Sequence, residues 1–164
     1  MKFIKLGLIS AGLFFILLFG ISALMPGNIR ILRTVSLEAS PQQVAPWLHD
    51  LRAWKDWNLL TSDSTAKAPE FSPDAIRSGN YTIRKISDTT GQVITEWHSR
   101  SKTVKSYMQY AAGDDGTTVL QWIFDIELGW YPWDKFASMI FDKQLGIPME
   151  ESLDQLETLL TQPS

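Results

Sequence analysis

The side chains that could carry metal or nucleophilic chemistry are few in this sequence and widely spaced. Its two histidines, His49 and His98, belong to no His-x-x-x-His or His-Glu motif. The chain has no cysteine, which excludes disulfides, thiolate metal sites and cysteine nucleophiles. A Gly-rich phosphate loop, a nucleophile elbow and the Ser-His-Asp order are also missing from the sequence. We therefore predict neither a metal site nor a cofactor.

Three polar side chains in strand-like runs remain as candidate acids or bases: Glu96, His98 and Tyr107. A carboxyl group buried in an apolar interior would have a raised pKa and could transfer a proton. However, alternation along a strand places Glu96 and His98 on the face opposite Trp97, and therefore in solvent if Trp97 points inward. We expect His49, on the polar side of a short helix, to have a structural or surface role.

Aromatic side chains are the most abundant feature of the sequence beyond its first segment, which contains none of the seven tryptophans. Such a composition indicates either a heavily aromatic core or an aromatic-lined cavity. Because protein interiors are close-packed by default, both interpretations stay open. The residues that we predict to line a cavity are Trp54, Trp57, Trp97, Tyr107, Tyr110, Trp122, Phe124, Trp133, Phe136 and Ile140.

The first segment of the chain is an apolar run without a charge, from Leu6 to Met25. At about 1.5 Å per residue, a helix of this length spans roughly the 30 Å of a bilayer. Lys2 and Lys5 precede the run, and Pro26-Gly27-Asn28 ends it. We predict a transmembrane helix over 6–25, within a membrane anchor of residues 1–28. A cleaved signal peptide is the alternative, but the run is longer than usual and lacks a clean cleavage site.

Charged residues are unevenly distributed along the chain. The first 33 residues carry only Lys2, Lys5, Arg30 and Arg33, and the remaining 11 basic and 18 acidic residues give the rest a formal charge of −7. An acidic domain suits neither nucleic-acid phosphates nor an anionic surface, so we predict no nucleic-acid partner. The N-terminal lysines and α-amino group favour a cytoplasmic N-terminus, with the domain on the periplasmic or extracytoplasmic side of a single-pass membrane protein.

Residues 29–164 have the pattern of one α+β domain. Alternating or apolar strand-like runs cover 29–38, 80–87, 92–100, 103–112 and 117–128, and a further short strand is expected near 66–71. Helical patterns cover 41–51 and 52–58, and a long amphipathic one runs from Pro132 to the C-terminus with an interruption at Gly146-Ile147-Pro148. A long helix can bury the inner face of a curved antiparallel sheet. The order predicts a helix-grip fold with six strands, unless the segment 59–78 contains a further strand.

A family resemblance rests on Ala39-Ser40-Pro41, Val44, Trp47 and the run Asp50–Trp57, and also on Gly129–Phe136. These segments resemble the START-like superfamily known as SRPBCC, in particular its polyketide cyclase/dehydrase-like branch, although one residue is extra after Val44. The resemblance covers residues 30 to 161. It implies the helix-grip fold with seven strands. It also implies a cavity between sheet and C-terminal helix for a lipid, sterol, quinone or polyketide-like molecule. It implies no catalytic residue.

Three functions follow from these patterns. The first is a membrane-tethered binding domain that senses or transfers a hydrophobic small molecule, and Trp130-Tyr131-Pro132-Trp133 could dip into lipid headgroups to receive it. The second is an enzyme acting on an apolar substrate, with Glu96, His98 or Tyr107 as acid or base. The third is a protein-interaction scaffold with a vestigial cavity. A cavity above ~300 Å³ with apolar walls favours binding, whereas a filled core favours the scaffold.

Overall fold

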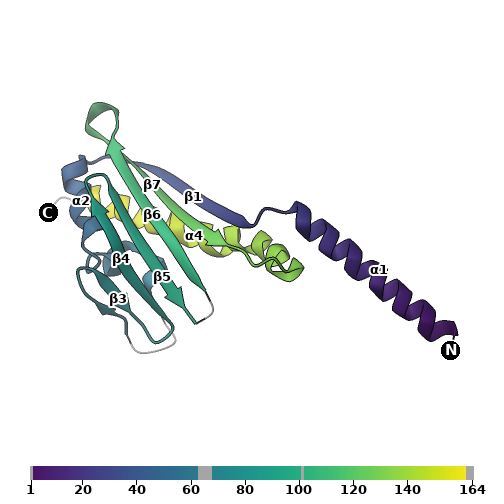
Figure 1. Cartoon of the computed structure of the whole chain (residues 1–164). Helices are drawn as coiled ribbons and strands as arrows, with labels where there is room; N and C mark the ends of the chain where they lie inside the picture. The colour runs from purple at the N-terminus through teal and green to yellow at the C-terminus, as the bar shows by residue number, and fades with distance from the viewer. Residues whose placement is uncertain (1, 63–67, 101, 162–164) are drawn as a thin grey trace.

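The computed structural model describes residues 2–62, 68–100 and 102–161, without the side chains of residues 2 and 136–139. Seven strands form one antiparallel sheet in the order β1-β7-β6-β5-β4-β3-β2 (Figure 1). Their bounds are Asn28–Leu37 (β1), Glu70–Phe71 (β2), Ala75–Arg77 (β3), Tyr81–Thr89 (β4), Gln92–Ser99 (β5), Thr103–Ala112 (β6) and Thr118–Glu127 (β7). Strands β2 to β6 each pair with the next strand in the sequence. Only β1 does not: it pairs with β7 and forms one edge of the sheet.

Helices precede and cover this sheet. Their bounds are Lys2–Leu24 (α1), Pro41–His49 (α2), Trp54–Trp57 (α3) and Pro132–Thr161 (α4), with short 3₁₀ turns at Leu59–Thr61 (η1) and Asp114–Gly116 (η2). The side chain of Gln43 accepts the backbone N–H of Ser40 at 2.9 Å, as the capping pattern at the start of α2 predicts. The layered sheet with α4 across its inner face is the helix-grip fold, as predicted.

The alternation in β1 determines which face of the sheet is inner. Ile29, Ile31, Val35 and Leu37 point towards α4, while Arg30 and Leu32 are exposed. Tight turns connect the central strands, and Gly91 adopts a φ of +83° in the turn between β4 and β5. A Cβ at that position would also lie 3.1 Å from the Tyr110 carbonyl oxygen. Glycine is therefore favoured here both by the positive φ and by the close backbone approach.

Two predictions about the elements were wrong. The segment 59–78 contains two short strands, β2 and β3, where one was expected near 66–71, and these bring the sheet to seven strands. In addition, α4 is continuous through Gly146 and Pro148, where an interruption was expected. Pro148 lacks an N–H and cannot bond the carbonyl four residues earlier. Burial of Met149 and Leu153 immediately after it favours continuing the helix over ending it.

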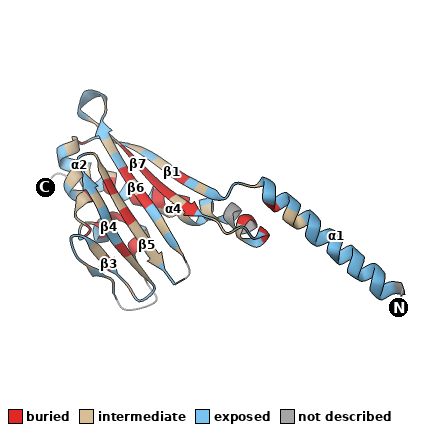
Figure 2. Cartoon of the chain, in the orientation of Figure 1, coloured by how far each residue is buried: buried red, intermediate tan, exposed pale blue. Residues whose placement is uncertain are grey.

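The apolar N-terminal helix α1 projects from the domain, contacts it only near its C-terminal end, and is almost entirely exposed (Figure 2). Its stretch Phe3–Leu24 has a mean hydropathy of 2.3, and its length and composition suit a membrane span. A signal sequence has the same two properties. The prediction of an apolar N-terminal helix is confirmed, and membrane insertion stays a prediction.

Candidate ligand-binding site

The inner face of the sheet is organised in rows of side chains that run across the strands. The row nearest α1, here called the proximal row, contains Ile29, Ile126, Val104 and Trp97: Ile29 pairs with Ile126, and Val104 pairs with Trp97. Strands β6 and β7 are antiparallel and Lys105 pairs with Asp125, so the next pair along the two strands is Val104 with Ile126. The rows further from α1 form the distal half of the site. Both halves face α4.

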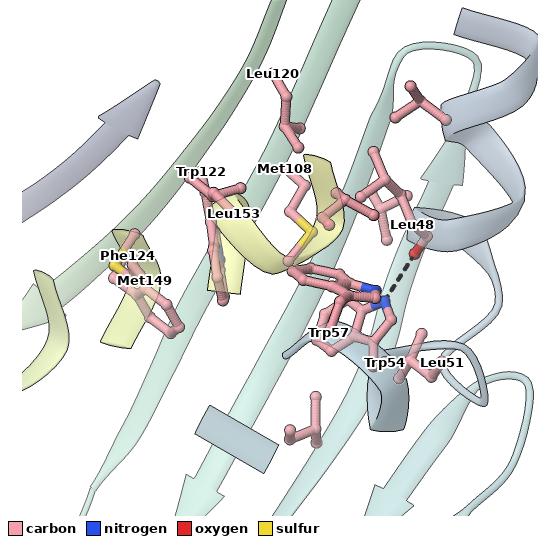
Figure 3. Close-up of a cluster of buried hydrophobic side chains, with 14 of the residues drawn as sticks. Leu48, Leu51, Trp54, Trp57, Met108, Leu120, Trp122, Phe124, Met149 and Leu153 are labelled. Carbon is pink, nitrogen blue, oxygen red and sulfur yellow. Dashed lines mark hydrogen bonds between the residues drawn. The ribbon is translucent and has the colours of Figure 1, made fainter. Parts of the chain in front are cut away.

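The distal half is filled by aromatic side chains. Trp54, Trp57 and Trp122 are each at most 1% exposed, and Phe124 is buried beside them (Figure 3). The Trp57 and Trp122 ring centroids are 5.7 Å apart, and those of Trp122 and Phe124 are 5.6 Å apart. Met149 and Leu153 of α4 close this layer from the opposite side. Here the prediction of aromatic clustering corresponds to close packing.

Each tryptophan of this interior has a protein acceptor for its indole N–H. Trp122 donates to the Ser106 hydroxyl at 2.8 Å, and Trp97 donates to the Thr95 hydroxyl at 3.0 Å. Two backbone carbonyl oxygens, those of Leu48 and Trp47, accept from Trp54 and Trp57. A buried indole N–H without an acceptor costs free energy, so these bonds fix the rings as structural parts. None of them needs a ligand to be satisfied.

The proximal row is less completely covered. Ile29, Val104 and Trp97 are only partly buried, as are Phe141 and Leu145 on the facing part of α4. The ammonium group of Lys102 lies 5.2 Å from the centre of the Phe141 ring. Apolar side chains that stay partly in contact with water retain a driving force for further burial. This end of the helix–sheet layer is therefore the less completely buried part of the apolar interior.

Arg33 lies at the β1 edge of the inner face, in the same row as Trp122, and sequence analysis did not identify it as a site residue. It occupies an inward position of β1, and its guanidinium binds Asp142 at 3.1 Å and Glu150 at 2.5 Å on α4. Burial opposes the charged form, but these two bonds outweigh it and raise the pKa of Arg33. A Cβ on Gly146 would overlap the guanidinium. The sequence signal is an arginine in register with four apolar residues.

Several predicted cavity residues lie elsewhere. Tyr107 is on the outer face of the sheet, because the inward positions of β6 are Ser106 and Met108. Tyr110 points inward but bonds His49 through its hydroxyl at 2.6 Å. Trp133 and Ile140 are exposed on α4. The side chain of Phe136 lies outside the described part of the chain.

The candidate acids and bases also lie on the outer face. His98 bonds Glu96 at 2.8 Å and the Thr103 hydroxyl at 2.9 Å, in a surface cluster opposite Trp97. With Tyr107 on the same face, Glu96, His98 and Tyr107 all point away from the space between sheet and helix. An acid–base reaction in that space would have to use other groups.

His49 belongs to a polar cluster at the far end of the sheet. Its Nδ1 bonds Asp88, and Lys85 bonds Asp88 at 2.7 Å and Asp74 at 2.9 Å. Burial raises the pKa of Asp88, but the bonds from Lys85 and His49 outweigh it and hold that pKa below its usual value. The cluster joins α2 to β4 and β6, which agrees with the structural role expected for His49.

Two surface hollows are lined partly by charged side chains. One of about 590 Å³ lies on the outer face around Lys105, Tyr107 and Asp125, and another of about 530 Å³ lies beside the His49 cluster. Across the described residues, no three His, Cys, Asp or Glu side chains are placed to hold a metal ion.

The helix-grip fold is shared with START-like proteins of known structure. Truncated norcoclaurine synthase from Thalictrum flavum is similar with a TM-score of 0.61 and 8% identity over 84% of this chain and 96% of that chain. CalU16 from Micromonospora echinospora matches at 0.58 and 13% identity, covering 82% of this chain and 76% of that one. A START superfamily protein from Mycobacterium smegmatis matches at 0.52 and 16% identity, covering 77% and 98%.

These similarities define the fold and no more, because all three identities are low. No family model and no curated protein matches the sequence.

Proposed function

We propose that this protein is a membrane-tethered binding domain for a hydrophobic small molecule such as a lipid, a quinone or a polyketide-like compound. Residues 1–28 are the anchor and residues 29–164 the domain. The observation that carries the proposal is the incomplete burial of the proximal row, where Ile29, Val104 and Trp97 face Phe141 and Leu145. An apolar molecule placed there would remove their remaining surface from water at about 25 cal/mol per Å².

The location of this row supports a ligand that comes from the bilayer. Ile29 is the second residue of β1, and only the residues from Met25 to Gly27 separate that strand from α1. The backbone N–H of Leu128, at the end of the neighbouring chain segment, donates to the Gly27 carbonyl at 2.9 Å. So short and bonded a connection keeps the proximal row next to the end of the anchor.

Binding is favoured over catalysis by the positions of the polar groups. The candidate acids and bases Glu96, His98 and Tyr107 point to the outer face, and the hydroxyls of Ser106 and Thr95 inside are occupied by indole N–H groups. An interior in which polar side chains bond one another suits the holding of an apolar molecule.

The orientation belongs to the same proposal. Lys2, Lys5 and the α-amino group precede the span, which favours a cytoplasmic N-terminus and a domain on the extracytoplasmic side. A reporter fused to the C-terminus and active only in the cytoplasm should be inactive. Activity of that reporter would contradict the orientation while leaving ligand binding open.

Native mass spectrometry of the full chain, released from detergent, tests the binding proposal. We expect a co-purified lipid-sized adduct on the wild-type protein and its loss in Val104→Glu, because a carboxylate in the proximal row opposes an apolar ligand. Gln109→Glu introduces the same charge on the same strand but on the exposed outer face, and should keep the adduct. Equal adducts in both variants would contradict the site, and no adduct on the wild type would favour a scaffold role.

A further inference from the structure

An exposed aromatic cluster lies where β7 leads into α4. It consists of Trp130, Tyr131 and Trp133, whose side chains stack in sequence with ring centroids 4.8 and 4.6 Å apart. Trp130 is 66% exposed and Trp133 is 58% exposed. Large aromatic rings that pack mainly on one another at a protein surface mark a contact with another apolar phase. The identity of that phase follows from the neighbours of the cluster.

Polar contacts hold the segment around this cluster against the end of α1. Lys135, only 8% exposed, donates from its ammonium group to the Ser22 carbonyl at 2.6 Å and to the Met25 carbonyl at 2.9 Å. The last carbonyls of a helix have no partner within the helix, and a cation at that end is electrostatically favourable. The hydroxyl of Ser22 in turn donates to the Trp130 carbonyl at 3.4 Å.

A ring contact fixes the level of the cluster along α1. The Trp130 ring lies 5.5 Å from the ring of Phe19, which is five residues before Leu24, the end of the apolar stretch. At about 1.5 Å per residue, Phe19 lies roughly 7–8 Å inside that end. In a bilayer spanned by α1, the Trp130 ring therefore reaches the boundary between headgroups and acyl chains, where Trp and Tyr are enriched.

We propose that Trp130, Tyr131 and Trp133 form a membrane-interface seat that inserts into the same bilayer as α1, with the lipid surface as its partner. The proposal rests on the proposed membrane anchoring of α1, but it needs no ligand in the proximal row. Lys135 stabilises the seat by joining α4 to the carbonyl end of α1. The domain then has two attachments to the bilayer, and the proximal end is held at its surface.

Tryptophan quenching by brominated lipid tests the seat. The full chain is reconstituted at one copy per nanodisc in phosphatidylcholine brominated near the headgroup end of the acyl chains. We expect the wild type to be quenched and the double variant Trp130→Phe, Trp133→Phe to lose most of the quenched intensity. Trp47→Phe is the matched control: it removes a tryptophan of α2, at the other end of the domain, and should leave the quenched intensity unchanged.

The remaining outcomes separate the seat from the anchor. Equal quenching in wild type and double variant, with the chain resistant to carbonate extraction, would overturn the seat and leave the anchor standing. A chain released by carbonate would overturn both. Protection of these rings from both brominated lipid and aqueous iodide would mean that protein covers them, which also overturns the lipid surface as partner. Lipid co-purification with Trp130→Phe, Trp133→Phe reports on the proximal row separately.

Discussion

The distal and proximal halves of the helix–sheet layer are covered by the same helix, but they differ in how completely it covers them. In the distal half, Met149, Leu153 and Leu156 of α4 are at most 2% exposed. In the proximal half, the sheet-facing side chains of the same helix, Phe141 and Leu145, are only partly buried. One α-helix thus provides a closed core at one end and an incompletely covered apolar surface at the other.

The difference comes from the other elements of the fold, which place side chains over one half and not over the other. The short helix α3 places Trp54 and Trp57 over the distal half, where Trp57 contacts Trp122. Trp54 also reaches the ring of Trp97, at the end of the proximal row. No described helix other than α4 and the end of α1 lies near the β1 side of the proximal half. Stability and binding capacity are therefore expected in different halves, and each can be changed without the other.

The largest effect is expected from Trp122→Ala. This substitution removes a fully buried ring and leaves the Ser106 hydroxyl without its donor, so the free energy of unfolding should fall by about 3–5 kcal/mol. Guanidinium unfolding of the full chain in detergent micelles, followed by near-UV circular dichroism, measures the loss. Trp133→Ala, an exposed position, should change it by no more than about 0.5 kcal/mol. Similar losses in the two variants would remove the distinction between the halves.

Gly146→Ala should destabilise the protein by about 1 kcal/mol. The added Cβ displaces the Arg33 guanidinium from Asp142 and Glu150, which more than offsets the roughly 1 kcal/mol gained from replacing a helical glycine. Hydrogen exchange should accelerate over the first half of α4 and stay unchanged after Met149. The neighbouring exposed residue offers the control Ile147→Ala, which leaves Arg33 in place. A net stabilisation by Gly146→Ala would show that Arg33 moves aside freely.

A smaller effect concerns pH and the His49 cluster at the distal end. The pKa of Asp88 is depressed, so its carboxylate stabilises the fold above the usual carboxyl range near pH ~4, and this contribution is lost as the pH falls below it. Because Asp88 is partly exposed and screened, the contribution is about 0.5 kcal/mol. Asp88→Asn should flatten the acid side of a stability–pH profile by that amount. Asp154→Asn, on an exposed position of α4, should reproduce the wild-type profile.

The smallest effect is expected from Tyr107→Phe. The Tyr107 side chain lies on the outer face, so the loss of its hydroxyl should change stability by less than about 0.5 kcal/mol and should leave lipid adducts unaffected. Thermal unfolding and native mass spectrometry measure the two quantities. A lost adduct would place ligand chemistry on the outer face and contradict the assignment of the site to the inner one.

Most of the fold could be predicted because its long elements have clear hydrophobic periods. Strands such as β1 and β6 alternate over ten residues, and α4 keeps its apolar stripe to the C-terminus. The three-residue strand β3 is too short to show a period, and it forms because Ile76 is buried in the sheet. Continuity of α4 through Pro148 likewise depends on packing that the local sequence does not contain.

The site was harder to predict than the fold, because it depends on which face of the sheet a side chain occupies and which groups it bonds, and residue type alone does not give either. Tyr107 and Met108 are adjacent in β6, and an error of one residue in the register moves a side chain from the inner to the outer face of the sheet. Arg33 could have been recognised, since it stands in register with Ile29 and Ile31. Lys135 could not, because its acceptors are backbone carbonyls more than a hundred residues earlier and have no side-chain signature.

The continuity of α4 has a mechanical consequence. Its 30 residues form a rod of about 45 Å, bonded to α1 near its first turn and packed into the distal core at its other end. If α1 spans a bilayer as proposed, a bilayer of different thickness would change its tilt, and this rod would carry that change to the domain. The point of least bending resistance is Gly146 to Pro148, where a backbone bond is missing and Arg33 lies across the helix. In the proposed membrane-anchored protein, a change of tilt would therefore bend α4 between its bonded first turn and its buried second half.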